Sequence, residues 1–389
     1  MLAKSNFFLL KKEAQDTMKH HVLILTLLSV LTIGYSQELQ KDDPDPYRIN
    51  TLRFEARIDY EGLITSDTSA NSGGFAGRFI NFALEGKLTH RFSYHYRQRL
   101  NIADVTFSSF FRGCDWLYLD YHLGKHFTFS AGKQIVYIGG FEYDYAPIDV
   151  FYWSRFWNNV VCYEMGASVA FHDTARNHTV LFQVCNSPFV SKPFENIYAY
   201  NLIWYGKMGF FSTIYSLNLI EYAKNHYITY ISLGNKFTFN NLSFYIDFQN
   251  RASFAQKNFL FKDFTLIGQI DYWFNHHWNL FIKGGYDVNH AQDAATPYQM
   301  AYDKLVLPGE EYYYCGIGGF YYPLNNEMIR LHAFFAVNHL DYTTYQLNAG
   351  LTWKMDFLQA FKYLNTQKIY TQKRPRKGHR TLEKNNNED

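Results

Sequence analysis

Alternation of apolar and polar residues runs through most of this chain and constrains its fold more than any other feature. Between residues 52 and 60, every second residue is apolar, and the polar residues between them are Arg53, Glu55, Arg57 and Asp59. A period of two places successive side chains on opposite faces of a β-strand. The stretch RFSYHYRQRL, residues 91–100, repeats the pattern, with Arg97 and Arg99 on its polar face. The sequence therefore predicts an all-β protein.

The spacing of the alternating runs indicates how the strands are connected. We count sixteen strands of about ten residues, and the uncertain boundaries are also compatible with fourteen or eighteen. Short connections such as Gly124–His126 and Asn240–Asn241 alternate with long ones such as Gly62–Gly77 and Ile135–Val160. An even number of strands, with short turns at one end and long loops at the other, is typical of outer-membrane barrels.

A soluble β-sandwich would also alternate, so the direction of the two faces has to be argued separately. The polar faces are dense in charge, and aromatic residues such as Phe92 and Trp353 lie near strand ends, where aromatic girdles occur. Aromatic residues make up 20% of the chain. Closure removes strand edges, which lipid does not tolerate, and about sixteen strands enclose an aqueous lumen. We therefore expect a transmembrane antiparallel β-barrel whose polar faces point inward.

The N-terminal region has the parts of a secretory signal. A basic start at Met18 precedes the apolar run Val22–Ile33, and Gly34 and Ser36 are small residues suited to a cleavage site. The run is shorter than the ~20 residues that span a bilayer. We expect residues 1–36 to comprise an upstream extension and the signal, with Met18 as the true start and cleavage after Ser36. Residues 37–47 would be a linker, 48–357 the barrel and 358–389 a polar basic tail.

Other function classes find little support in the composition. The net charge of +2 is too balanced to indicate nucleic-acid binding. The four cysteines are far apart and form no CxxC motif, so we expect no metal site and no cofactor. No GxSxG or HExxH motif occurs, and the many histidines lie mostly at turns or on polar faces, which argues against an enzyme.

The long connection Ile135–Val160 is the most distinctive stretch. It is rich in aromatic residues, and Gly139 and Gly140 permit a sharp bend. One interpretation is that it folds into the lumen as a constriction, where charge and radius set selectivity; the other is a surface Ω-loop packed on itself. We favour the constriction because long loops in compact folds are usually functional. Its candidate residues are Tyr137, Glu142, Tyr143, Asp144, Tyr145, Asp149 and Arg155.

The polar faces of the strands supply the candidate pore-lining residues. The predicted basic set is Arg53, Arg57, Lys87, Arg97, Arg99, Lys283 and Arg330. Acidic residues on the same faces nearly balance this set. The strands that carry Arg53, Arg57, Arg97 and Arg99 flank one common strand, so these arginines could form a positive strip. Alternatively they form salt bridges inside the lumen with Glu55, Asp59 and Glu85, and the sequence leaves both interpretations open.

Three stretches resemble a known family: YHYRQRLN (94–101), WLYLDYHLGKHFTFSAGKQ (116–134) and GGFEYDYAPIDVFYW (139–153). They resemble the phosphate-selective porin O and P family, in particular its Bacteroidetes-type members, and the likeness extends over residues 48–357. The resemblance implies a sixteen-stranded porin in the outer membrane of a Gram-negative bacterium, usually a homotrimer surrounded by lipid. It also implies a third long loop folded into the pore and passive uptake of small anions, with phosphate as the best-known solute.

This sequence departs from the family's pattern in its charge. The family lines its pore with arginine and lysine clusters, whereas the connection Ile135–Val160 carries three acids and one arginine. We therefore expect passive diffusion of small hydrophilic solutes with a weak anion preference and phosphate as one candidate. The alternative is a non-conducting barrel that serves as a surface adhesin or as a scaffold for a partner.

Overall fold

The computed structural model describes most of the region predicted to form the barrel. The described residues are 48–66, 71–101, 111–190, 195–253, 260–290, 303, 305–325 and 327–358. The predicted signal, the linker and nearly all of the C-terminal tail lie outside these ranges, so those interpretations stay predictions. No helix in the described part of the chain is long and apolar enough to cross a membrane.

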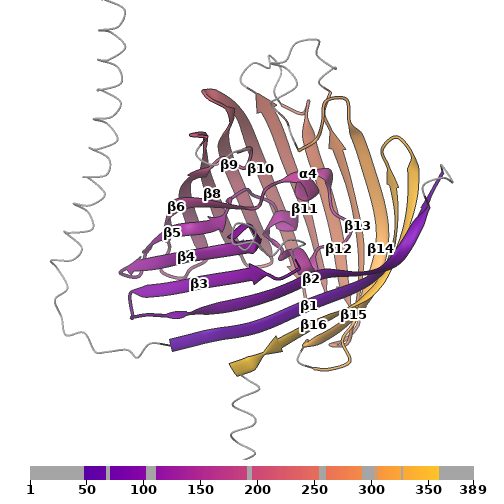
Figure 1. Cartoon of the computed structure of the whole chain (residues 1–389), viewed down its shortest axis with the longest axis horizontal. Helices are drawn as coiled ribbons and strands as arrows, with labels where there is room; N and C mark the ends of the chain where they lie inside the picture. Colours follow the sequence, from indigo (N-terminus) through magenta and orange to yellow (C-terminus); the bar gives the residue numbers. More distant parts are fainter. Residues whose placement is uncertain are drawn as a thin grey trace, which may run out of the picture.

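The described residues form one closed antiparallel β-barrel, in which each strand pairs with its neighbours in sequence and β1 pairs with β16 (Figure 1). The strands are β1 (Arg48–Thr65), β2 (Ser72–Lys87), β3 (Phe92–Arg99), β4 (Cys114–Leu123), β5 (Phe127–Ile135), β6 (Tyr163–His172), β7 (His178–Asn186), β8 (Tyr198–Met208), β9 (Phe211–Ala223), β10 (His226–Phe239), β11 (Leu242–Ser253), β12 (Phe264–Trp273), β13 (Trp278–Val288), β14 (Glu311–Tyr321), β15 (Ile329–His339) and β16 (Thr343–Asp356). The predicted sixteen-stranded barrel is confirmed.

Several strands are longer than the predicted ten residues. β1 has 18 residues and β2 has 16, and they pair through Gly62 and Gly73, inside the stretch predicted to be a long connection. The prediction of a loop over Gly62–Gly77 was therefore wrong for most of its length. Glycines have no side chain that could alternate, so the hydrophobic pattern disappears there although the backbone hydrogen bonds continue.

The two faces of the strands differ as the alternation predicts. On β1, Ile58 is 53% exposed and its neighbour Asp59 is fully buried. On β13, Ile282 is 50% exposed and Lys283 is 2% exposed. Because the barrel is closed, the exposed apolar set is the outer surface and the buried polar set faces inward.

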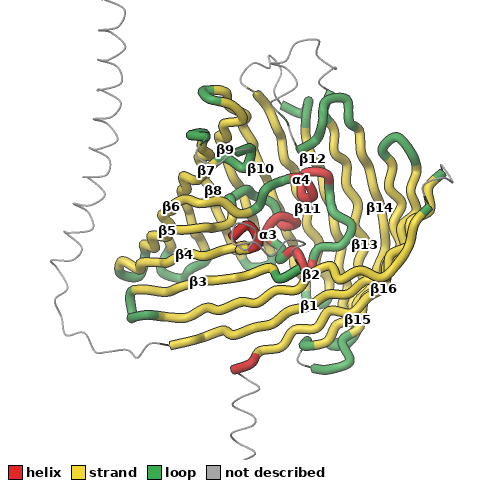
Figure 2. The backbone as a smooth tube through the Cα atoms, viewed as in Figure 1, coloured by secondary structure: helices red, strands yellow, loops and turns green. Residues whose placement is uncertain are grey.

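The connection between β5 and β6 is the only long one that the structure describes without a gap. We call residues 136–160 the β5–β6 segment. It contains the short helices α3 (Phe141–Asp144) and α4 (Arg155–Asn159) and the 3-10 turn η2 (Pro147–Asp149), drawn in red in Figure 2. Gly140, which precedes α3, has a φ of 109°, a conformation that strongly favours glycine.

Candidate functional site

Apolar side chains of the β5–β6 segment pack on the barrel strands along its whole length. Val136, Ile138 and Phe156 belong to one buried cluster with residues of β9 and β10. Phe141 belongs to a second cluster, which includes Tyr245 of β11. A third contains Phe151 and Tyr152 and the residues Phe281, Tyr314, Phe334 and Ala336 of β13–β15. The segment is therefore packed on the strands and not only on itself.

Two carboxylates of the barrel strands hold the N-terminal ends of the segment's helices. Asp247 accepts hydrogen bonds of 2.8 Å from the backbone N–H groups of both Phe141 and Glu142. Asp287 accepts bonds from the N–H groups of Arg155, at 3.0 Å, and Phe156, at 3.4 Å. The first N–H groups of a helix have no partner within it, so an acceptor there satisfies them and complements the positive end of the helix dipole.

A buried ion pair joins the segment to β13. The Lys283 ammonium donates to Glu142 Oε1 at 2.6 Å and to the carbonyl oxygens of Phe151 and Tyr152 at 3.1 Å each. Glu142 also accepts from the hydroxyl of Ser154, at 2.6 Å, and from its N–H group. Both charged side chains are only 2% exposed. Lys283 therefore joins two parts of the segment, Glu142 and the adjacent pair Phe151 and Tyr152.

Arg57 of β1 holds the middle of the segment from the other side. Its guanidinium pairs with Asp59 at 2.8 Å and donates to the carbonyl oxygens of Ile148, at 3.2 Å, and Val150, at 3.0 Å. It also lies over the ring of Phe151, 4.0 Å from the centroid. Arg57 is therefore paired with Asp59, and its other N–H groups donate to backbone carbonyl oxygens of the segment.

Asp149 provides a third charged contact between the segment and the strands. Its carboxylate lies 2.7 Å from Arg330 of β15 and 3.2 Å from Lys354 of β16. Burial by itself raises the pKa of the Asp149 carboxyl, but Arg330 and then Lys354 outweigh that effect and hold the pKa below its ordinary value. Asp149 therefore stays ionised in the folded protein over the neutral and mildly acidic range.

The predicted basic residues fall into three groups in the structure. Arg57, Lys283 and Arg330 contact the β5–β6 segment, as described above. Arg97 and Arg99 both pair with Asp115, at 3.4 Å and 2.9 Å. The remaining two, further toward the short-turn end, are Arg53, which is half-exposed and 3.5 Å from Glu55, and Lys87, which is exposed.

Asp115 was not among the predicted residues, and a β-bulge explains why. In the β3–β4 pairing, Arg97 faces Trp116 and Gln98 faces Cys114, so Asp115 is the extra residue. A bulge re-aims a side chain and breaks the simple alternation. The buried pair of Arg251 with Asp303, at 2.7 Å, was also missed, because Asp303 lies in a stretch without strand periodicity.

The predicted residues of the segment have different environments. Tyr143 is buried, Asp144 is exposed, and Arg155 lies 2.5 Å from Glu310. Tyr137 accepts a hydrogen bond on its carbonyl oxygen from Asn218 of β9. The hydroxyl of Tyr145 accepts one of 3.0 Å from Lys236 of β10, a residue that the prediction did not include.

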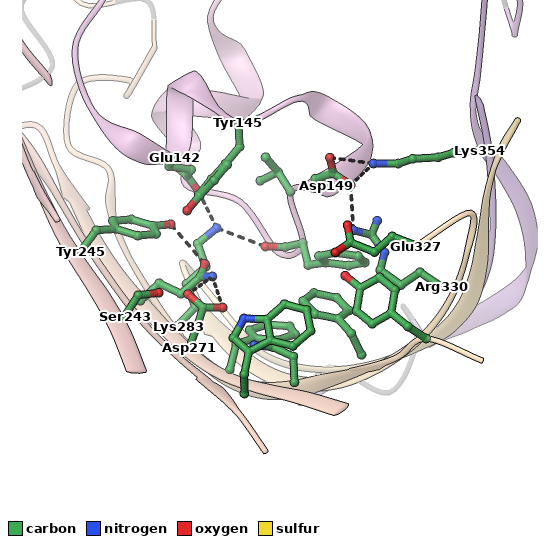
Figure 3. A pocket seen from close by; sticks show the side chains of 18 of the residues that line it. Glu142, Tyr145, Asp149, Ser243, Tyr245, Asp271, Lys283, Glu327, Arg330 and Lys354 are labelled. Atoms are coloured by element: carbon green, nitrogen blue, oxygen red, sulfur yellow. Dashed lines mark hydrogen bonds and ion pairs between the residues drawn. The ribbon is translucent and has the colours of Figure 1, made fainter. Parts of the chain in front are cut away.

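A cavity of about 600 Å³ lies between the β5–β6 segment and the short-turn end of β10–β16 and β1 (Figure 3). Glu142, Tyr145 and Asp149 of the segment line one part of it. Side chains of both charges and several aromatic rings line the rest. Within the described ranges, no three histidine, cysteine or acidic side chains are grouped so that they could hold a metal ion.

Comparisons with known proteins agree with this architecture. Residues 51–210 match the model of the family "Phosphate-selective porin O and P". No curated protein matches the chain.

Solved structures show the same fold at low sequence identity. An anion-selective porin from Comamonas acidovorans matches with a TM-score of 0.58 and 9% identity, over 80% of this chain and 100% of that one. The outer-membrane channel DcaP of Acinetobacter baumannii matches with a TM-score of 0.54 and 10% identity, over 81% and 99%. OmpT, expressed in the outer membrane of Vibrio cholerae, matches with a TM-score of 0.53 and 11% identity, over 82% and 100%. The chain thus has the fold of outer-membrane porins, and its part from β1 to β8 matches the porin O and P family model.

Proposed function

We propose that this protein is a porin in the outer membrane of a Gram-negative bacterium, through which small hydrophilic solutes diffuse passively. The observation that carries the proposal is the closed sixteen-stranded barrel with an apolar outer face and a charged inner face. Barrels of this size enclose an aqueous lumen, and those with eight strands are filled by side chains. We further propose that the β5–β6 segment lies across the lumen and narrows the path, because the residues that hold it are on the inner face.

A weak anion preference is part of the proposal. The family match and the anion-selective porin of the same fold support it, as do the partly exposed Arg53 and Arg99 on the inner face. Several of the predicted cations are already paired with carboxylates, so we expect the preference to be modest. Phosphate is one candidate solute, and relatives of the Bacteroidetes type and a homotrimer embedded in lipid fit the same proposal. One of the solved porin-like structures is described as a trimer.

Single-channel recording in a planar bilayer tests this function. Purified protein should open steady conductance steps, and in a KCl gradient the reversal potential should show that Cl⁻ permeates better than K⁺. The variant with Arg97→Glu and Arg99→Glu should reduce the Cl⁻ preference, and Lys125→Glu with Lys207→Glu, at two exposed positions beside short turns, serves as the charge-matched control. A cation preference in the unmodified protein would contradict the proposed selectivity.

The same recording separates the porin from the other candidate function. The β5–β6 segment is held by many contacts, and a barrel closed by it could serve as a scaffold or adhesin whose loops do the work. A reconstituted protein that is correctly folded and opens no conductance steps would favour the scaffold.

A further inference from the structure

Aromatic rings line part of the cavity between the β5–β6 segment and the short-turn end of the barrel. The diffusion of inorganic ions does not require such rings. The cavity wall includes two pairs of stacked aromatic rings. Trp273 and Tyr322 lie 5.5 Å apart at an interplanar angle of 25°, and Phe281 and Phe320 lie 4.9 Å apart at 19°. The ring of Phe151, from the segment, lies 5.2 Å from Phe320. Of these rings, Phe151, Phe281 and Tyr322 are nearly buried, whereas Trp273 and Phe320 are partly exposed and form the aromatic surface of the cavity.

Polar and charged side chains flank this surface on both sides. Figure 3 shows Ser243 and Asp271 on one side of the pocket and Arg330 and Lys354 on the other. Five cationic and five acidic side chains line the cavity, so its lining is neutral overall. Such a wall offers hydrogen-bond donors and acceptors in similar number without an excess of either charge.

One lining residue points to a bound solute more directly. Asn279 of β13 is 1% exposed, and its Oδ1 atom accepts no hydrogen bond from any described residue. It lines the cavity, and it is paired in the β-sheet with both Trp273 and Phe320. A buried amide oxygen without a partner costs free energy, which a hydroxyl donor from a solute would restore.

These features exclude most classes of solute. The face of an aromatic ring carries negative charge, so a small anion gains nothing from it, and the five cations of the lining are offset by its five carboxylates. An organic cation would be repelled by Arg330, which already lies 5.0 Å from the centre of the Phe320 ring. A wholly apolar molecule would cover charged and polar side chains on both sides without forming hydrogen bonds with them.

We infer that the cavity binds neutral carbohydrate, as pyranose rings that stack on the aromatic surface while their hydroxyl groups bond to the flanking polar side chains. A pyranose has one face of C–H groups and a rim of hydroxyls that both donate and accept hydrogen bonds. Its chemistry therefore matches an aromatic surface flanked by polar and charged side chains whose charges cancel. A volume of about 600 Å³ is within the range of small-molecule sites, roughly 300–1,000 Å³.

This inference rests on the proposed function, because the solute reaches the cavity through the lumen, and the experiment separates the two. Maltotriose, added to a single channel of the full chain, should cause brief, concentration-dependent blocks of the current. Sorbitol has a similar set of hydroxyls without a ring and should cause none at the same concentration of hexose units. Calorimetric titration of the detergent-solubilised protein with maltotriose measures binding without any need for conduction.

Two matched tryptophans provide the variants. Trp273→Ala removes a ring of the aromatic surface and should raise the half-blocking concentration roughly three- to tenfold, the effect of one aromatic contact. Trp278→Ala, on the outward face of the next strand and 50% exposed, should leave it unchanged. Asn279→Leu should also weaken the block, with no change in conductance without sugar.

Each outcome decides one of the two proposals. If the channel conducts and the titration shows no binding, or sorbitol blocks as well as maltotriose, the carbohydrate inference fails and the porin stands. Equal block by phenylalanine would assign the cavity to aromatic zwitterions instead and also overturn it. If the protein does not conduct but the titration shows binding that Trp273→Ala weakens, the porin fails and the carbohydrate site stands.

Discussion

The inner face of this barrel uses its charged residues in two different ways. On β1, β11, β13 and β15, the side chains of Arg57, Asp247, Lys283 and Arg330 are buried and bond to the β5–β6 segment. On β3 to β7, polar side chains bond from strand to strand: His95 to Asp120, Ser93 to His122, Thr128 to His172, and His172 to Thr179. The first set of side chains positions a separate segment, and the second set bonds within the wall of the barrel.

The position of a charged residue on the polar face of a strand therefore does not define its role. Lys283 and Arg53 both lie on polar faces and are both basic. Lys283 is surrounded by acceptors of a segment more than a hundred residues away in sequence, whereas Arg53 is half-exposed beside its neighbour Glu55. Burial converts the first into a structural contact, and exposure keeps the second available to solutes.

Of the substitutions considered, Lys283→Met should reduce the free energy of unfolding most. It leaves the Glu142 carboxylate and two carbonyl oxygens buried without their cation, and breaking a buried pair in this way costs about 3–5 kcal/mol. Urea unfolding in detergent micelles, followed by tryptophan fluorescence, measures the loss, and single-channel traces should become unsteady as the segment is released.

Lys354→Met is the control for this prediction, because its partner is also on the segment but its side chain is 31% exposed. A partly exposed pair is expected to contribute about 1 kcal/mol or less. Equal losses in the two variants would mean that the buried pair has no special role in holding the segment.

A comparison of two aspartates sharpens the distinction between the regions. Asp247→Asn replaces one of two acceptor oxygens with an amide, so one of the N–H groups at the start of α3 loses its acceptor. A buried N–H group left without its acceptor costs about 1–3 kcal/mol. Asp120→Asn, in the strand-to-strand region, should cost less than about 1 kcal/mol, since Asp120 is partly exposed and bonds to side chains that can rotate toward water. The same unfolding assay compares them, and the reverse order would contradict the assignment of the two regions.

The sequence was sufficient for the fold because the alternation is a local property of each strand. Alternating apolar and polar residues mark the individual strands, and closure of the barrel follows because the two edge strands need a hydrogen-bonding partner. The alternation failed only where the backbone departs from it, as at Asp115 in the bulge and at Gly73 in the β1–β2 hairpin.

The candidate site was less predictable because it depends on contacts between distant parts of the chain. Spacing placed Arg57, Lys283 and Arg330 on inner faces, but it could not show that the segment's carbonyl and carboxylate oxygens surround them. The choice of partner depends on how the segment crosses from β5 to β6, and no local pattern in the sequence encodes this path. The importance of Asp247 and Lys236 was missed for the same reason.

The smallest effect we predict is a dependence of channel behaviour on acid pH through Asp149. The carboxyl pKa is lower in the folded protein than in the unfolded chain, where it is about 4. The ionised group therefore stabilises the fold above that pH, and this contribution is lost as the pH falls through the lower, folded value. Protonation would release Arg330 and Lys354 from the segment, so current noise in the unmodified protein should rise as the pH falls through the lowered pKa of the folded protein. Asp149→Asn should show that noise already at neutral pH and little further change on acidification. If acid produces the same rise in Asp149→Asn, the titrating group lies elsewhere and the role assigned to Asp149 is wrong.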